Sequence, residues 1–336
     1  MARRDRTTGL PRPRPRRDTR AQSKFAFAEQ HQSLLLWVAG GLLLVVLLGL
    51  LGYRWYDNNF LRPDKTILAV NEEKFSLRYY SDRLFLAASQ ASGTQANFSI
   101  LQQALLTDLE DEAIGTILAR ERGITVTDED ITAEIASQLG VAVGGAGSSF
   151  DTLYRQRLRS VNMSDGAYRR YIEAVVYLNK LRDSYASEIG DRGELVTLRA
   201  VVSPTKEAAD AVAARIKGGE DLGTVAQNES NDVTSRQKDG LMEPEPVRLL
   251  PEAIRTAIEG KSEGSEVLGP VEVTPGNFWV FRIQARQPQG DLSETQKGQL
   301  ADLQLEDALA EKRGQVDIDR NMSSDDFQWA NDHADD

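Results

Sequence analysis

One uninterrupted apolar segment constrains this chain more than any other feature of its sequence. Residues 34–52 read LLLWVAGGLLLVVLLGLLG and contain no charged residue. A helix rises about 1.5 Å per residue, so this segment spans roughly 28 Å, close to the thickness of a membrane's hydrocarbon core. Trp37 near one end, and Tyr53 and Trp55 at the other, match the aromatic residues that gather at membrane interfaces. We therefore expect a transmembrane anchor over residues 34–53.

The net charge changes sign across the apolar segment. Residues 1–33 carry a net charge of +6 and the remaining residues carry −17, within a formal net charge of −11. Positively charged segments next to a transmembrane helix usually stay on the cytoplasmic side of the membrane. We therefore expect residues 1–33 to be a basic, disordered cytoplasmic tail and the residues after 53 to be extracytoplasmic. PRPRPRR in the tail has a second interpretation, as a polyproline ligand. Cleavage as a signal peptide is disfavoured, since the apolar run is long and no A-x-A-like site follows it.

Composition limits the partners and the chemistry of the exported body. Its acidic character argues against nucleic acid as a partner, which leaves membrane lipid around residues 34–53 and other polypeptides. The chain has no Cys and only two His, His31 and His333, with none between them. Disulfides, thiolate nucleophiles, cysteine or histidine metal sites and imidazole catalysis in a folded core are therefore excluded. We expect no metal, nucleotide or organic cofactor.

The first part of the body, residues 54–190, has the pattern of a helical domain. ILAVNEEKF predicts a short strand and turn, and Ser76 is placed to cap the helix that follows. A long amphipathic helix ends at Gly123, and Thr127 with Asp130 predicts the start of the next one. VAVGGAGSS lacks the G-K-[ST] ending of a phosphate loop, so we interpret it as a connector. A last capped helix ends near Gly190.

The second part, residues 191–288, changes to mixed strands and helices. LVTLRAVVS predicts a strand, three short helical patterns follow, and VLGPVEVTPGNFWVFRIQAR predicts two strands around a Pro-Gly turn. This order is typical of a compact α+β domain. Residues 289–336 then contain a charged amphipathic helix and an acidic tail with little core of their own. We expect this C-terminal helix to pack back on the helical domain.

Several motifs resemble the exported chaperones of the SurA, PrsA and PpiD type, which carry a parvulin-type (PpiC, or rotamase) peptidyl-prolyl isomerase domain. LLTDLEDEAIGTILARERGITVTDEDITAEI is similar to the second helix and following turn of their helical domain. AADAVAARIKGGEDLGTVAQNES and LPEAIRTAIEGKSEGSEVLGPVEVTPGNFWVFRI resemble the parvulin helix pair and its closing strands. The likeness covers about residues 66–320 and implies an α+β multi-domain protein that assists unfolded or nascent exported polypeptides.

The resemblance also implies where the parvulin catalytic residues would lie. The two family histidines fall on Ala200 and Trp279, so both are missing. The acid position falls on Asp232 and the threonine of the hydrogen-bond network on Thr274, and both are kept. We take Asp232 and Thr274 as candidate catalytic residues. Asp232, following Ser-Asn, has an alternative interpretation as a turn or helix-capping residue.

The resemblance places the proline-binding pocket on three further residues. The family's leucine falls on Leu241, its methionine on Leu249 and its phenylalanine on Ala253. Trp279 shares one side of its strand with Phe281, and we expect it to lie opposite Ala200, so that a small and a large residue together fill the space of two imidazoles. The alternative is that Trp279 forms a new peptide-binding surface.

Three functions remain open on these residues. The first is a membrane-anchored extracytoplasmic folding factor with reduced or lost isomerase activity. The second is a working, histidine-free prolyl isomerase that uses Asp232, Thr274 and the Leu241/Leu249 pocket. The third is a scaffold for a single partner at the membrane surface. Fold alone does not decide among them.

Overall fold

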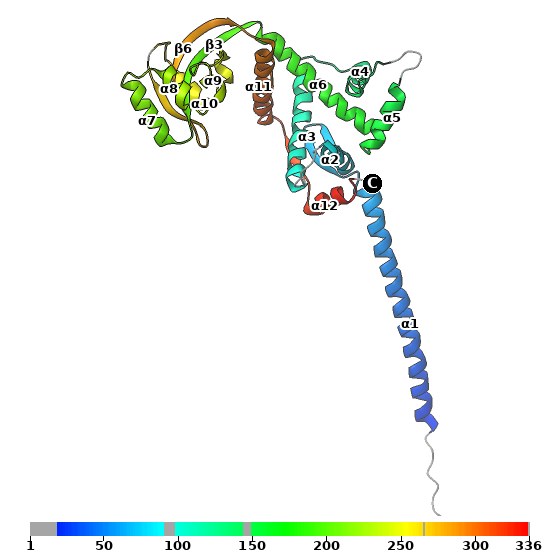
Figure 1. Cartoon of the computed structure of the whole chain (residues 1–336). Coiled ribbons are helices and arrows are strands. Elements are labelled where there is room, and N and C mark those ends of the chain that lie inside the picture. The colour runs from blue at the N-terminus through cyan, green and yellow to red at the C-terminus, as the bar shows by residue number, and fades with distance from the viewer. Residues whose placement is uncertain (1–18, 91–97, 144–148, 265, 335–336) are drawn as a thin grey trace, which may run out of the picture. The chain divides into compact units, whose positions relative to one another are not determined.

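A computed structural model describes residues 19–90, 98–143, 149–264 and 266–334 (Figure 1). The chain divides into two compact units, Met1–Lys65 and Thr66–Asp336, which are described separately. The first 18 residues of the predicted basic tail, and residues 144–148 of the predicted glycine-rich connector, lie outside the described residues.

The first unit consists mainly of helix α1, Thr19–Tyr56, the long blue helix of Figure 1, which continues into the π-helix η1, Asp57–Leu61. α1 begins inside the segment predicted as a disordered tail, because residues 19–33 contain no Gly or Pro to interrupt a helix. Its side chains are described from Trp37 onward, except at residue 39. Across the described parts of the chain, no helix is both long and apolar enough to cross a membrane. The predicted anchor over residues 34–53 therefore stays a prediction.

A helical domain opens the second unit. Its hairpin turns at Asn71, whose φ of 51° is in the left-handed region, and Ser76 Oγ accepts from Tyr79 N–H at 3.3 Å, so the predicted cap is present. Buried aliphatic and aromatic side chains from the hairpin and helices form one core. The elements are β1 (Thr66–Val70), β2 (Glu73–Ser76), α2 (Leu77–Gln90), α3 (Phe98–Glu121), α4 (Asp128–Leu139), α5 (Phe150–Ser160) and α6 (Asp165–Ile189).

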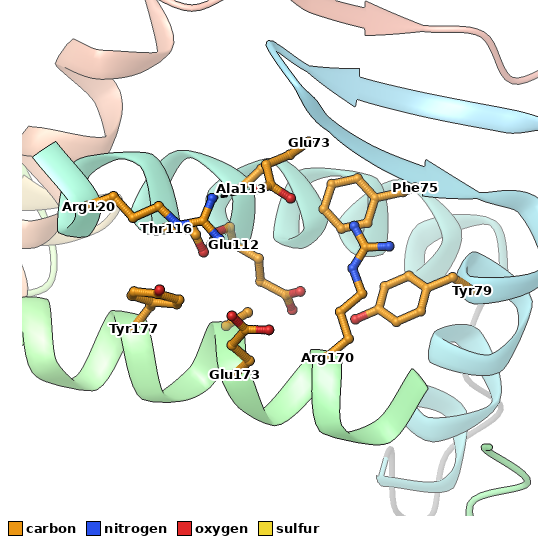
Figure 2. A pocket seen from close by; sticks show the side chains of 11 residues that line it. Glu73, Phe75, Tyr79, Glu112, Ala113, Thr116, Arg120, Arg170, Glu173 and Tyr177 are labelled. Carbon is orange, nitrogen blue, oxygen red and sulfur yellow. Dashed lines mark hydrogen bonds and ion pairs between the residues drawn. The ribbon is translucent and has the colours of Figure 1, made fainter. Parts of the chain in front are cut away.

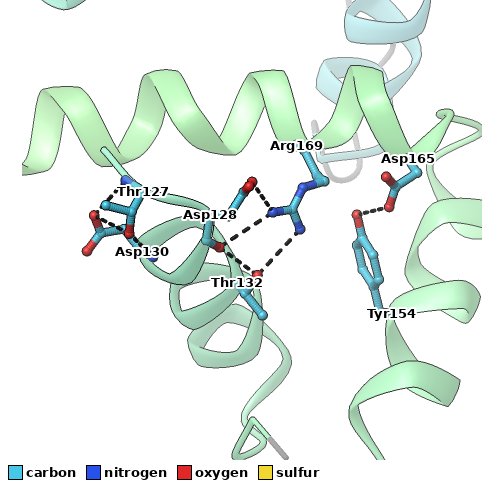
Figure 3. A network of polar contacts seen from close by, with 7 residues as sticks. All are labelled: Thr127, Asp128, Asp130, Thr132, Tyr154, Asp165 and Arg169. Carbon is cyan, nitrogen blue, oxygen red and sulfur yellow. Dashed lines mark hydrogen bonds and ion pairs between the residues drawn. The ribbon is translucent and has the colours of Figure 1, made fainter. Parts of the chain in front are cut away.

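Polar contacts hold α4 and α5 against α6 (Figure 3). Thr127 and Asp130 form the predicted capping box at the start of α4. Arg169, on α6, forms an ion pair with Asp128 at 2.8 Å. Tyr154, on α5, donates to Asp165 at 2.8 Å. The helix α5 was not predicted from the sequence, because it follows the glycine-rich stretch and buries no side chain fully.

The C-terminal segment completes the helical domain, as predicted for its helix α11, Glu294–Arg313. Ala301 of α11 is fully buried in a cluster with Tyr177 and Leu181 of α6. Beyond it, β7 (Ile318–Arg320) pairs antiparallel with β1, which gives a sheet of order β2-β1-β7. Helix α12 (Ser324–Asp332) then packs on α2. The strand and the last helix extend the predicted contact into the core of the domain.

The α+β domain lies between α6 and α11 in the sequence and contains a four-stranded sheet of order β4-β3-β6-β5. The predicted Pro-Gly turn joins β5 to β6 at Gly276, whose φ is +74°. Sequence patterns did not predict β4 or α9, which are only a few residues long. The elements are β3 (Arg192–Ser203), α7 (Lys206–Lys217), α8 (Leu222–Glu229), α9 (Val233–Arg236), β4 (Glu245–Pro246), η2 (Val247–Leu249), α10 (Glu252–Ile258), β5 (Leu268–Thr274) and β6 (Asn277–Asp291).

The two faces of this sheet are buried differently. Val201 and Val280 pack with buried residues of α7 and α8, whereas Ala200 and Phe281 pack with α10 on the other face. The predicted pairing of Ala200 with Trp279 is wrong, because Ala200 lies opposite Phe281, and Trp279 lies opposite Val202. Trp279 does share its face with Phe281, as the alternation of the strand predicted.

Candidate functional site

An open cavity of about 280 Å³ lies on the α10 side of the sheet. Its walls are mostly apolar, with a few polar groups near them, which is the usual character of a ligand pocket. The strands β3 and β6, the helix α9 and the segment leading to η2 all contribute. The lining residues are Val196, Leu198, Asp232, Thr234, Ser235, Lys238, Leu241, Met242, Glu243, Glu245, Leu250 and Trp279.

Asp232 reaches this cavity as the N-cap of α9. Its carboxylate accepts from Ser235 N–H at 2.9 Å. The nearby Ser235 hydroxyl, together with the backbone N–H groups of Ser235 and Thr234, lowers the pKa of Asp232. Asp232 is therefore an ionised carboxylate at neutral pH, so it accepts hydrogen bonds and does not act as an acid. Asp232 therefore caps α9 and also lines the cavity, so the two interpretations of this residue are compatible.

One polar atom that lines the cavity has no hydrogen-bond partner. The indole Nε1 of Trp279 is inaccessible to solvent and unpaired, whereas the buried hydroxyl of Ser235 lies beside the Asp232 carboxylate and helps to lower its pKa. Ser235 is 3% exposed. Buried polar groups are nearly always paired in proteins, so the unpaired indole N–H beside the cavity is unusual. Leu241 lies with them, held by a bridge to Arg199 of β3.

The structure thus brings together Asp232, Leu241 and Trp279 but places the other predicted residues elsewhere. Thr274 is exposed at the end of β5, next to the turn. Ala253 lies on α10 and does not line the cavity, and Ala200 is fully buried in the core behind it. Thr274, Ala253 and Ala200 thus lie on elements of the same domain but do not line the cavity.

Leu249 also points away from the cavity, and its neighbour Leu250 lines it. Leu249 packs against the cluster of Leu195, Leu292 and Leu300. The 3-10 turn η2 ends at Leu249, with Leu250 N–H donating to Val247 at 3.2 Å, so the two consecutive leucines face different sides. Sequence reasoning could not choose between them, because the direction depends on this short turn.

A second, much smaller cavity of about 50 Å³ lies in the helical domain, between β2, α3 and α6 (Figure 2). Arg170 projects from α6 toward the rings of Phe75 and Tyr79, at 4.7 and 4.8 Å. Arg120 forms an ion pair with Glu73 at 2.7 Å. These charged groups already have partners within the protein, so this cavity is a seam between packed elements.

Comparison with protein families matches the two parts of the body separately. Residues 25–182 match the model of a SurA-like N-terminal domain. Residues 182–296 match the model of a PPIC-type PPIASE domain. No curated protein matches the chain.

Solved structures of several chaperones resemble the chain at low identity. The peptidylprolyl isomerase PrsA from Bacillus anthracis is 15% identical, with a TM-score of 0.42 over 63% of this chain and 96% of that one. PrsA from Bacillus cereus is 12% identical, with a TM-score of 0.42 over 82% and 100%. A SurA-like chaperone of Campylobacter jejuni is 14% identical, with a TM-score of 0.26 over 75% and 94%.

The assignment rests on the two domain models and their order. A SurA-like helical domain runs directly into a PPIC-type domain, and their combined match extends from residue 25 to residue 296. The chain belongs to the SurA/PrsA-type chaperones that carry a parvulin-type domain.

Proposed function

We propose that this protein is a membrane-anchored extracytoplasmic folding factor for exported polypeptides, whose parvulin-type domain binds clients with reduced or no isomerase activity. One observation carries the proposal: the two positions that match the family histidines hold Ala200 and Trp279. Prolyl isomerisation has a barrier of about 18–20 kcal/mol, which an active site lowers by stabilising the twisted amide. Here Ala200 is in the hydrophobic core and offers no hydrogen bond to that amide.

The geometry of the remaining groups supports the loss of activity. Of the four residues assigned to a histidine-free isomerase, Asp232 and Leu241 line the cavity, whereas Thr274 and Leu249 do not. His333, the one histidine whose side chain is described, stacks on Trp329 of α12 in the helical domain. No imidazole of the described residues lines the cavity of the α+β domain.

Chaperone action is tested by the aggregation of an unfolded reporter protein, followed by light scattering. The full chain in lipid nanodiscs is compared with Asp232→Ala and with the matched variant Asp221→Ala. Asp221 also caps a helix through one backbone N–H, at 2.8 Å, but does not line the cavity. We expect equal suppression by all three. No suppression by the unaltered chain would contradict the chaperone function and favour the scaffold for one partner.

Isomerase activity is tested separately by NMR exchange spectroscopy of a short X-Pro peptide. Uncatalysed exchange takes about tens to hundreds of seconds, so weak catalysis gives measurable cross-peaks. We expect the full chain to leave the exchange rate unchanged. Acceleration that Asp232→Ala abolishes and Asp221→Ala keeps would establish the second candidate, a histidine-free isomerase, which the joint presence of Asp232 and Leu241 at the cavity favours.

Membrane anchoring through residues 34–53 is supported by the charge-free run and by the exposure of its large side chains. Leu42 is 65% exposed and Leu51 is 64% exposed. Because the chain has no Cys, single substitutions report topology cleanly. In intact cells a membrane-impermeant maleimide should label Glu207→Cys and spare Thr8→Cys. Labelling of both, or recovery of the chain without membranes, would contradict the anchor and its orientation.

A further inference from the structure

Helix α1 continues beyond the charge-free segment, and the side chains that follow this segment stay exposed. The last four residues of α1 and the π-helix η1 extend the helical structure from Tyr53 to Leu61. Five of these residues have large aromatic or aliphatic side chains that are between 49% and 65% exposed: Tyr53, Trp55, Tyr56, Phe60 and Leu61. A contiguous exposed apolar surface of this kind marks a place where another molecule binds.

The π-helix gathers three of these rings on one side. Arg62 N–H donates to the carbonyl of Asp57 at 2.8 Å, which closes a turn wider than that of an α-helix. In this turn the ring of Phe60 lies 5.6 Å from that of Trp55 and stacks on that of Tyr56 at 5.5 Å. We call Trp55, Tyr56 and Phe60 the ring cluster. Because Trp and Tyr combine an apolar ring with a polar group, such a cluster suits a boundary between apolar and wet surroundings.

The ring cluster belongs to the same part of the molecule as the predicted anchor. Met1–Lys65 form one compact unit, and the body from Thr66 onward forms another. Tyr53 comes directly after Gly52, the last residue of the charge-free segment. From Tyr53 to Leu61 a helix rises about 12 Å, and each headgroup layer of a bilayer is roughly 6–8 Å thick. A charge-free segment in the hydrocarbon core therefore places the ring cluster in the headgroup layer.

The local charge favours phospholipid, more than the acidic body, as the molecule that covers the cluster. Residues 53–65 contain Arg54, Arg62 and Lys65 against Asp57 and Asp64, a net charge of +1, whereas the chain after residue 33 carries −17 overall. Arg62 Nε approaches the Asp57 carboxylate only to 4.0 Å, so it forms no hydrogen bond with it. Arginine binds phosphate through several N–H donors at once. The segment thus offers rings to the acyl boundary and guanidinium groups to lipid phosphates.

From these observations we infer that residues 53–62 lie in the headgroup layer of a phospholipid membrane and hold the exported body at its surface. The ring cluster lies at the boundary with the acyl chains, and Arg54 and Arg62 contact phosphates. Thr66, the first residue of β1, follows Leu61 by five residues, so it stays within roughly 18 Å of the membrane. The inference rests on the proposed anchor and adds where the folding factor works, which is on polypeptides at the membrane surface.

The depth of the segment is tested in the full chain, in nanodiscs of pure phospholipid. The chain has no Cys, so the environment-sensitive dye NBD is attached to Leu44→Cys, Phe60→Cys or Glu72→Cys. Glu72, exposed in the turn between β1 and β2, is the control for water. We expect aqueous iodide to quench the dye about threefold less at residue 60 than at residue 72, and a nitroxide near the lipid headgroup to quench it more than a deep one. Equal quenching by iodide at residues 60 and 72 would overturn the inference.

A second experiment tests whether the rings hold the body at the surface. A donor dye on Glu72→Cys transfers energy to acceptor dyes on the lipid headgroups. Tyr56→Ser with Phe60→Ser should lower the transfer efficiency by about a third, because the segment loses two of its interfacial rings. Ile100→Ser with Val233→Ser removes two exposed apolar side chains from the body and should leave the efficiency unchanged. The same efficiency in both double variants would show that the ring cluster does not hold the body there.

The dye at residue 44 separates failure of this inference from failure of the proposed function. If residue 44 is shielded from iodide and residue 60 is not, the anchor is correct and only the inferred interface is wrong. If both are open to iodide, residues 34–53 do not enter the membrane, and the anchoring in the proposed function is wrong. If residue 60 is shielded in native membranes but not in pure phospholipid, a membrane protein covers the ring cluster, which also overturns the inference.

Discussion

The buried ion pair of the helical domain and the buried indole beside the cavity of the α+β domain differ in how they are paired. In the helical domain Arg83 and Glu112 form a two-pronged ion pair, at 2.6 and 2.8 Å, with side chains about 10% exposed or less. The Arg83 guanidinium also lies 4.2 Å from the ring of Tyr171. In the α+β domain, Trp279 Nε1 is buried with no hydrogen-bond partner. The ion pair joins α2 to α3, although the Nε atom of Arg83 itself has no partner, whereas the indole N–H of Trp279 joins nothing.

The domains also differ in how the chain closes them. The α+β domain is one continuous segment, whereas the helical domain is built from segments on both sides of it in the sequence. Ser81 of α2 donates to the carbonyl of Ala330 at 2.9 Å, and Gln102 of α3 donates to that of Phe327 at 3.2 Å. The stability of the helical domain therefore depends on residues that come after the α+β domain in the sequence. Predictions that act on one domain and spare the other test this contrast.

The largest effect is expected from removing the last strand and helix, residues 315–336. This truncation exposes Ile67 and Leu68, both fully buried, and removes Arg320, which pairs with the buried Glu110. We expect the helical domain to lose amide protection in hydrogen-exchange mass spectrometry while the α+β domain keeps its own. Removing only residues 335–336 is the control. Protection of α2 and α3 at the control level would show that the shared core is dispensable.

The next effect concerns the buried ion pair of the helical domain. Glu112→Ala leaves the Arg83 guanidinium buried without its carboxylate, which should lower the free energy of unfolding by about 3–5 kcal/mol. Glu73→Ala breaks the exposed pair with Arg120 and should cost less than about 1 kcal/mol. Chemical denaturation of each variant measures the difference. Equal costs would mean that water reaches Arg83 and that the contrast between the domains is weaker than described.

Local sequence patterns predicted most elements of both domains, because caps and turns act over a few residues. The capping box of Thr127 and Asp130, the cap at Ser76 and the Pro-Gly turn at Gly276 are all present. The helix α5 and strand β4 were missed. α5 has only partly buried residues, and β4 exists only because β3 lies beside it. Elements that depend on a distant partner leave little trace in their own sequence.

The candidate site was predicted less completely than the fold. Asp232, Leu241 and Trp279, which were chosen by family position, each line the cavity, and their roles stay a prediction. Ser235 and Leu250 were missed, because one depends on the direction of a single helical turn and the other on η2. The predicted pairing of Ala200 was off by two residues of β6, a shift that leaves every side chain on the same face, so the alternation of the strands could not exclude it. The unpaired polar atoms could be found only in three dimensions.

A smaller effect is expected on how the stability of each domain depends on pH. Burial raises the pKa of Asp82, on α2, to about 6 from its ordinary 3.8. The folded state then holds this proton more tightly, so its contribution to stability is full below about pH 4 and is lost as the pH rises through 6. Asp82→Asn should stabilise the helical domain at pH 7, by on the order of 1 kcal/mol given its partial exposure, and not at pH 4.

Asp232, in the α+β domain, has a lowered pKa, so its effect on stability should change with pH in the opposite direction to that of Asp82. Its lowered pKa means that its contribution to stability is present above pH 3.8 and is lost as the pH falls through the folded value. Asp232→Asn should therefore destabilise its domain at pH 7, and the difference from the unaltered chain should shrink in acid. Thermal melts of both variants from pH 3 to 7 measure the two trends. If the stability differences of Asp82→Asn and Asp232→Asn changed with pH in the same direction, the environments assigned to the two carboxyl groups would be contradicted.

The smallest effect is expected at Ser235, and its small size is what makes it informative. Its buried hydroxyl helps to lower the pKa of Asp232, whose carboxylate also accepts from the backbone N–H of Ser235. Ser235→Ala therefore removes one of two contacts and should lower the free energy of unfolding by less than about 1 kcal/mol. Ser230, fully buried in the same domain, accepts from Val202 N–H at 3.1 Å, so Ser230→Ala leaves that N–H unpaired and should cost about 1–3 kcal/mol. Urea denaturation compares the two. A cost at Ser235 as large as at Ser230 would mean that the hydroxyl is the main support of the Asp232 carboxylate. A much smaller cost would mean that the backbone N–H of Ser235 holds this carboxylate largely by itself.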